Sequence, residues 1–169
     1  NYRGAKNIAV KSVVDEALEK TIFIEKVIVC KRTNAEVQMR LGRDLWWHEA
    51  IEGQSIDHQA ATLDSEDLLF ILYTSGSTGK PKGVVHSIGG YMVYTQYSFL
   101  NVFQYEQNDI YWCTADIGWI TGHSYIIYGP LLSGATTLMF EGVPTYPHPG
   151  RFWEIIDKYK VNQFYTAPT

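Results

Sequence analysis

The sequence has 169 residues, of which 46% are hydrophobic and 19% are charged, and this is enough apolar material for the core of one domain. Its net charge is −4, and its 14 basic side chains are scattered rather than clustered as nucleic-acid or anionic-membrane binding requires. Its apolar stretches are shorter than the roughly 20 residues of a membrane-spanning helix. We therefore expect neither a nucleic acid nor a membrane as partner.

The cysteines and the two ends of the chain bear on its context. Cys30 and Cys113 are isolated, which fits reduced thiols in a cytoplasmic protein better than a disulfide framework. The sequence has no initiator Met and no secretory signal pattern, and it stops where a strand pattern ends. We expect a segment of a longer chain, whose targeting cannot be read from these residues.

Strand-like and helix-like segments alternate along the chain. Short apolar runs bounded by turn residues predict strands, and apolar positions three and four apart predict helices. The expected strands cover residues 24–30, 68–73, 83–86, 110–114, 136–140 and 163–166, and the expected helices cover 12–20, 44–51, a segment capped by Ser87, 121–132 and 151–159. This alternation predicts an α/β fold of βαβ units with a mostly parallel sheet.

A loop rich in glycine and hydroxyl groups follows the apolar run at 68–73, which has the pattern of a strand covered on both faces. Glycines let backbone N–H groups approach an anion, hydroxyl groups donate hydrogen bonds, and lysines supply positive charge. The pattern predicts a phosphate-binding loop, although it is neither a Walker A loop nor a dinucleotide fingerprint, and a solvated turn is the alternative. Its members are Thr74, Ser75, Gly76, Ser77, Thr78, Gly79, Lys80, Lys82 and Gly83.

Residues 73–86, Tyr-Thr-Ser-Gly-Ser-Thr-Gly-Lys-Pro-Lys-Gly-Val-Val-His, resemble the signature loop of the adenylate-forming enzymes, which include acyl-CoA synthetases and luciferases. In that family the loop holds the phosphates of ATP while a carboxylate attacks the α-phosphate. The resemblance implies that Lys80 stabilises phosphate charge in catalysis. It also implies ATP contacts by Thr74, Ser75, Gly76, Ser77, Thr78, Gly79 and Lys80.

A second informative stretch, residues 116–130, follows one predicted strand and opens a helix, so we expect it at the same sheet edge as the glycine loop. Trp119, Ile120 and Thr121 would form a tight, mainly apolar wall with one hydroxyl group. Such a wall suits a very small acyl group. The alternative is that Gly118 and Gly122 only allow close packing of a helix on a strand.

Residues 119–125, 128–132 and 134–144 resemble the AMP-forming acetyl-CoA synthetase family, and the similarity extends over nearly the whole chain. The resemblance implies an acetate pocket at Trp119, Ile120 and Thr121. Propionate-preferring relatives tend to have Val in place of Thr121, so Thr121 favours acetate. The implied CoA contacts are Arg3, Lys6, Thr121 and Thr145, with Lys6 standing where the family usually has Arg and Thr145 where it often has Asn.

The resemblance implies a two-step reaction in which ATP and acetate form acetyl-AMP and pyrophosphate, and the CoA thiol then displaces AMP. Mg²⁺ would arrive with ATP, because no histidine lies at metal-ligand spacing from a cysteine or an acid. In the family, the adenine-binding stretch and the small C-terminal domain with its catalytic lysine lie beyond Thr169. Residues 1–169 would thus be an internal segment of the AMP-binding N-terminal domain, inactive alone.

Two other functions remain open. One is a propionyl-CoA or other short-chain acyl-CoA synthetase, and the other is a nucleotide-binding module that has lost catalysis.

His86 and His123 lie in sequence near the predicted site, and we favour a structural hydrogen-bonding role for both. The oligomeric state cannot be read from the sequence.

Overall fold

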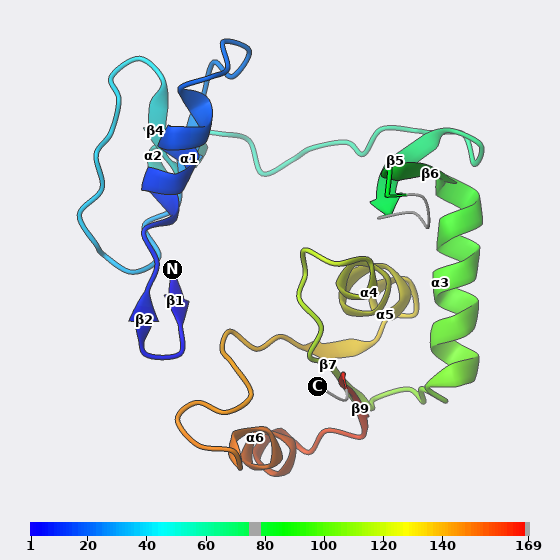
Figure 1. Cartoon of the computed structure of the whole chain (residues 1–169). Helices are drawn as coiled ribbons and strands as arrows, with labels where there is room; N and C mark the ends of the chain where they lie inside the picture. The colour runs from blue at the N-terminus through cyan, green and yellow to red at the C-terminus, as the bar shows by residue number, and fades with distance from the viewer. Residues whose placement is uncertain (75–78, 168–169) are drawn as a thin grey trace. The chain divides into compact units, whose positions relative to one another are not determined.

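The computed structural model describes residues 1–74 and 79–167, which fall into two compact units (Figure 1). The first unit comprises Asn1–Ala60 and Gly142–His148. The second comprises Ala61–Glu141 and Pro149–Thr169. Each unit has its own packing and is described by itself.

The first unit contains two small sheets and two helices. Strands β1 (Tyr2–Arg3) and β2 (Lys6–Asn7) form an antiparallel hairpin, and β3 (Val27–Val29) pairs in parallel with β4 (Asp44–Trp46). The helices are α1 (Val10–Leu18) and α2 (Trp47–Ile51). The helix expected at 44–51 is therefore wrong in its first part, because side chains 44–46 alternate between half-buried and exposed positions, which is the period of a strand.

Four charged side chains hold α1 against the end of the loop before β4. Lys11 and Asp15 are four residues apart on α1 and so share one face of the helix. Lys11 Nζ also lies 2.8 Å from Asp44 Oδ2, and the Arg43 guanidinium contacts both Asp15 and Asp44. Because α1 has no buried residue, these ion pairs are a major part of its attachment.

The second unit opens with an antiparallel hairpin of β5 (Leu68–Thr74) and β6 (Lys82–Ser87). The expectation that residues 68–73 form a buried strand of the parallel sheet is wrong, since Leu68, Ile71 and Tyr73 are exposed and the described strand paired with β5 is β6. A short loop joins neighbouring strands in the antiparallel sense, whereas parallel pairing needs a longer crossover. The glycine loop thus ends a separate hairpin rather than sharing a sheet edge with residues 116–130.

A parallel sheet of order β8-β7-β9 forms the centre of the second unit, as the βαβ pattern predicts. Its strands are β7 (Ile110–Cys113), β8 (Thr136–Leu138) and β9 (Gln163–Tyr165). The helices are α3 (Ile88–Val102), α6 (Arg151–Tyr159) and a continuous helical segment made of α4 (Ile120–Gly122), the π-helix η1 (His123–Tyr128) and α5 (Gly129–Leu132). This segment replaces the single α-helix expected at 121–132.

The central strand β7 buries both of its faces. Tyr111 packs with Phe99 of α3 and Ile126 of η1, whereas Trp112 points the other way, to Phe152 of α6. Tyr111 and Trp112 are both 0% exposed. Helices thus cover the two faces of the sheet, which is the usual arrangement around parallel strands.

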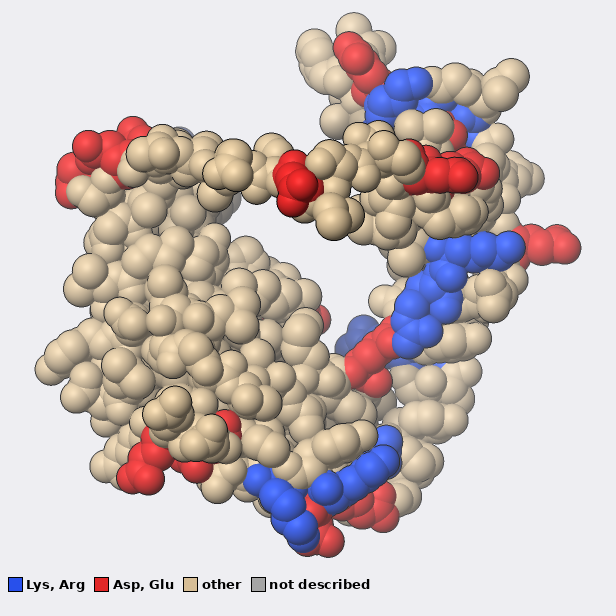
Figure 2. All heavy atoms as spheres, turned by 180° about the vertical axis from the view of Figure 1, so that it is seen from behind, with Lys and Arg blue, Asp and Glu red and all other residues tan. Residues whose placement is uncertain are grey.

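Charged groups lie mostly at the surface, where basic and acidic side chains are interspersed on the face that Figure 2 shows. On α6, for example, Arg151 lies 3.8 Å from Glu154, and Lys160 just after the helix lies 2.9 Å from Asp157. Among the described helices, none combines the length and the apolar character needed to cross a membrane.

Candidate active site

The turn end of the β5–β6 hairpin carries the described parts of the glycine loop. Thr74 and Lys82 are paired across the two strands. Gly79 has a φ of +77°, a backbone conformation that residues other than glycine adopt only with strain. Lys80 and Lys82 are exposed and form no ion pair with any residue that the structure describes. Their positive charge is therefore available to an anion. The predicted ATP contacts Ser75, Gly76, Ser77 and Thr78 lie outside the described residues.

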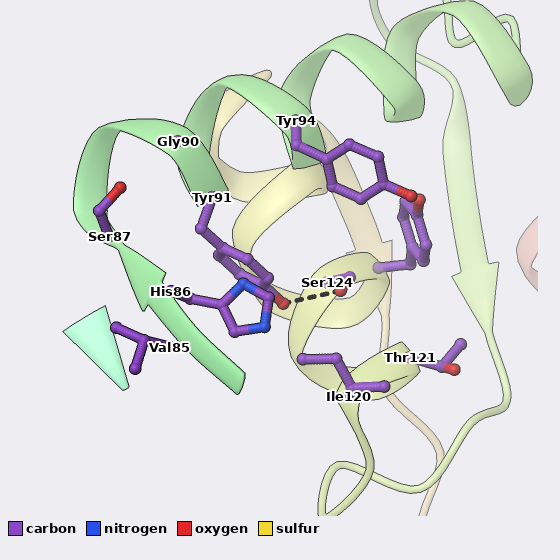
Figure 3. Close-up of a pocket in the computed structure, with 10 residues that line it drawn as sticks. Val85, His86, Ser87, Gly90, Tyr91, Tyr94, Ile120, Thr121 and Ser124 are labelled. Carbon is purple, nitrogen blue, oxygen red and sulfur yellow. Dashed lines mark hydrogen bonds between the residues drawn. The ribbon is translucent and has the colours of Figure 1, made fainter. Parts of the chain in front are cut away.

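A pocket of about 570 Å³ lies between β6, α3 and the helical turn that begins at Ile120 (Figure 3). Its lining is apolar, aromatic and hydroxylic, and none of the Asp, Glu, Lys or Arg residues in the described ranges contributes to it. Such a lining suits an uncharged small group better than a phosphate. The lining residues are Val85, His86, Ser87, Gly90, Tyr91, Tyr94, Ile120, Thr121, Ser124 and Tyr125.

The structure brings two of the three predicted acyl-pocket residues together. Ile120 and Thr121 line the pocket as half-buried residues of α4. Trp119 precedes them at the N-cap position, does not line the pocket, and is 71% exposed.

A close contact positions α4. A Cβ atom at Gly122 would lie 2.3 Å from the Asp116 carbonyl oxygen and 2.8 Å from Ile117 Cα, so a larger residue there would push the helix away from the preceding loop. Gly122 therefore does allow the helix to pack closely, here on the loop at Asp116 and Ile117. It also serves the pocket, because the same helix carries Ile120 and Thr121.

The opposite wall contains residues that sequence reasoning did not assign to the site. Tyr91 and Tyr94 form this wall from α3, Ser124 on η1 lies on the side of Ile120 and Thr121, and the Tyr91 hydroxyl lies 2.7 Å from the Ser124 hydroxyl (Figure 3). Burial raises the pKa of Tyr91, so its phenol stays protonated. The available signal was spacing: Tyr91 and Tyr94 are three apart on one helix, and Ser124 follows Ile120 by four.

The two histidines expected near the site both contact aromatic rings. His86 lines the pocket with its ring centre 4.9 Å from that of Phe70 and 5.3 Å from that of Tyr91. His123 lies 6.2 Å from Phe70 by the same measure. Both histidine side chains thus pack against aromatic rings.

The predicted CoA contacts Arg3, Lys6 and Thr145 belong to the first unit, whereas Thr121 belongs to the second. Arg3 and Lys6 are directly opposite each other in the β1–β2 hairpin, which places two exposed positive side chains together. The turn between them packs on the segment that contains Thr145, since a Cβ atom at Gly4 would lie 3.5 Å from Val143 Cγ2. The structure thus brings three of the four residues into one unit.

The described residues do not form a metal site of their own. In the ranges 1–74 and 79–167, no group of three or more His, Cys, Asp or Glu side chains is placed to hold an ion. A Mg²⁺ site built only from these side chains does not fit the donors present.

The sequence matches the AMP-binding enzyme family over residues 4–169. It is 60% identical over 167 residues to the acetyl-coenzyme A synthetase of Desulfatibacillum aliphaticivorans, 57% over 168 residues to that of Bdellovibrio bacteriovorus, and 56% over 169 residues to that of Escherichia coli K12. These alignments cover 99% of this chain but 26% of each relative, so the chain spans about a quarter of their length. They confirm the resemblance stated from the sequence, and the chain belongs to the AMP-binding enzyme family.

Proposed function

We propose that this chain is part of an enzyme that activates acetate with ATP and transfers the acetyl group to CoA. The observation that carries the proposal is the identity of 56–60% over 99% of the chain to proteins named acetyl-coenzyme A synthetase. We further propose that residues 1–169 are an internal segment of the AMP-binding N-terminal domain. Because the chain spans 26% of those relatives, we do not expect it to complete the reaction alone.

In the first step the acetate oxygen attacks the α-phosphorus of ATP, and the bond to the departing pyrophosphate breaks. No protein nucleophile is needed, so catalysis consists of positioning and charge stabilisation. Lys80 would act on the negative charge that grows on pyrophosphate, and the loop from Thr74 to Gly79 would hold the phosphates. The exposed, unpaired state of Lys80 among the described residues supports this role. Mg²⁺ bound to ATP would neutralise part of the same charge.

In the second step the CoA sulfur attacks the acetyl carbonyl carbon, the thiol gives up its proton to water, and AMP leaves with the electrons of the broken bond between the acetyl carbon and the phosphate oxygen. Ile120 and Thr121 would hold the acetyl group, with the exposed Trp119 beside them, and Thr121 would also reach the thiol end of CoA. Arg3 and Lys6 would neutralise CoA phosphates. Thr145 would add a hydrogen bond from the segment that packs near them.

A second candidate substrate is propionate or another short acid. The pocket of about 570 Å³ favours it, because its described walls leave room for more than two carbons. We propose acetate first, since Thr121 is a hydroxyl residue where propionate-preferring relatives tend to have Val.

We also propose a cytoplasmic location, which is supported by the two free cysteines, Cys30 and Cys113.

The test uses the full-length protein that carries this chain. ATP–pyrophosphate exchange is measured with acetate, propionate, butyrate and no acid, and AMP and acyl-CoA are then measured after CoA is added. We expect exchange that depends on acetate and acetyl-CoA formation that depends on both acetate and CoA. Exchange driven best by propionate would shift the assignment to the second candidate. Nucleotide binding without exchange would indicate the noncatalytic module.

A further inference from the structure

One hydrogen bond joins the two walls of the pocket. The Tyr91 Oη and Ser124 Oγ atoms lie 2.7 Å apart, with Tyr91 on α3 and Ser124 on η1 (Figure 3). Both residues are 5% exposed, so each hydroxyl group has the other as a partner in place of water. The bond therefore fixes the beginning of η1 against α3.

Ser124 is on the same side of the helical segment as the two predicted acyl residues. It follows Ile120 by four positions and Thr121 by three, spacings that place side chains on one helix face, and all three line the pocket. The helix passes into its π-helical part at His123, and such wider turns are frequent at functional sites. A change at the Tyr91–Ser124 bond would thus move the wall that carries Ile120 and Thr121.

We propose that Tyr91 and Ser124 are a positioning pair whose hydrogen bond sets the width of the pocket between Ile120 and α3, and thereby which acids fit. The inference rests on the proposed function, because adenylation is the readout. The whole pocket is too large to exclude a longer acid by volume, so exclusion depends on where the wall stands. In this role both residues act through the position of Ile120.

The chain contains a matched control for this idea. Ser98 Oγ and Tyr125 Oη lie 2.9 Å apart and also join α3 to η1, but Ser98 does not line the pocket. Ser98 is 9% exposed, and its hydroxyl group also lies 2.7 Å from the Tyr94 carbonyl oxygen. If the two Ser–Tyr pairs only held helices together, removing either one would have the same consequences.

The experiment compares Tyr91→Phe, Ser124→Ala, the double variant and Ser98→Ala in the full-length protein. The readouts are kcat/KM in ATP–pyrophosphate exchange with acetate and with propionate, and the thermal unfolding midpoint. We expect the ratio of propionate to acetate to rise about tenfold in Tyr91→Phe and Ser124→Ala, and no further in the double variant, because each single change already breaks the bond. Ser124→Thr keeps the hydroxyl group and should keep the ratio, and Ser98→Ala should lower the midpoint without moving the ratio.

The inference is overturned if the wild type adenylates acetate while Tyr91→Phe and Ser124→Ala keep the wild-type ratio, or if Ser98→Ala shifts it equally. A wild type that adenylates no short acid would instead refute the proposed function, and the inference would fall with it. The double variant guards against misfolding, because it leaves no buried hydroxyl group without a partner and can therefore be measured if a single variant does not fold.

Discussion

The Lys11 ammonium lies 2.8 Å from the Asp44 carboxylate, which joins the first helix of the chain to a strand that begins 33 residues later. The two side chains are 8% and 0% exposed. Asp44 also contacts the Arg43 guanidinium and accepts a hydrogen bond from the Arg40 backbone N–H. One carboxylate thus satisfies three groups, one from α1 and two from the loop before β4.

Replacing Asp44 tests how much this contact stabilises the first unit. Asp44→Asn removes the negative charge and leaves Lys11 and Arg43 close together with less compensation. We expect the free energy of unfolding to fall by about 1.5–3 kcal/mol, the range for hydrogen bonds to charged groups. Urea unfolding followed by tryptophan fluorescence measures it. Asp157→Asn is the control, because the exposed Asp157–Lys160 pair should contribute little, and equal losses in both variants would contradict the prediction.

The same carboxylates predict a dependence of stability on pH. The hydrogen bond from Arg43 holds the pKa of Asp44 below its usual range, and the bond from Lys11 lowers the pKa of Asp15. Because both pKa values are lower in the folded state, their contribution is fully present above the unfolded carboxyl pKa of about 4 and is lost as the pH falls further. The urea midpoint of the wild type should therefore drop as the pH falls from about 5 to about 2, and part of this drop should disappear in Asp44→Asn. A drop of the same size in the variant would exclude Asp44 as a source.

Lys80 is the residue to change in the glycine loop. Lys80→Ala should slow ATP–pyrophosphate exchange by roughly 10²- to 10³-fold with a small effect on the KM for acetate, because its charge is needed where pyrophosphate charge develops. Lys82→Ala removes an equal charge two residues away and should lose much less. Unchanged exchange in Lys80→Ala, or an equal loss in Lys82→Ala, would remove the special role of Lys80.

Ile120 can be tested for acid selectivity. Ile120→Ala opens space in the pocket and should shift the preference between acetate and propionate by about tenfold to a hundredfold, since one methylene is worth about 1–3 kcal/mol in an apolar pocket. Ile127→Ala makes the same change on the same helical segment outside the pocket lining and should leave the preference unchanged. Exchange kinetics with acetate, propionate and butyrate provide the measurement. Identical preferences in both variants would mean that Ile120 only packs.

Thr121 tests a separate contact of the same wall. Thr121→Val keeps the shape of the side chain and removes the hydroxyl group, so acyl-CoA formation or acetate use should fall while ATP binding remains. Measured rates of acetyl-AMP formation and of its reaction with CoA separate the two steps. If Thr121→Val formed acetyl-AMP and acetyl-CoA at wild-type rates, the Thr121 hydroxyl group would have no role in either step.

Arg3 and Lys6 should act on CoA alone. Arg3→Ala and Lys6→Ala should each raise the KM for CoA about tenfold, equivalent to about 1.4 kcal/mol, and should leave exchange without CoA unchanged. Lys20→Ala, another exposed lysine in the first unit, is the control. An unchanged KM for CoA in both hairpin variants would move the phosphate contacts elsewhere.

The sequence by itself determined the family and the parallel part of the fold. The loop motif and the stretches near Trp119 are local patterns, so they can be recognised without a structure, and the comparisons confirmed the family that they indicate. The alternation of strands and helices after residue 110 also predicted β7, β8, α6 and β9 within a few residues. In that region the apolar residues lie in short runs that match the period of each element.

Only the tertiary structure decided which segments are partners. The apolar run at 68–73 predicts a buried strand, but its pairing with β6 shows that it is one arm of a partly exposed antiparallel hairpin. The Tyr91–Ser124 bond spans 33 positions and the Lys11–Asp44 pair also spans 33, so neither leaves a local pattern. Hydrogen bonds and ion pairs of this kind depend on how separate elements approach each other, and periodicity describes each element alone.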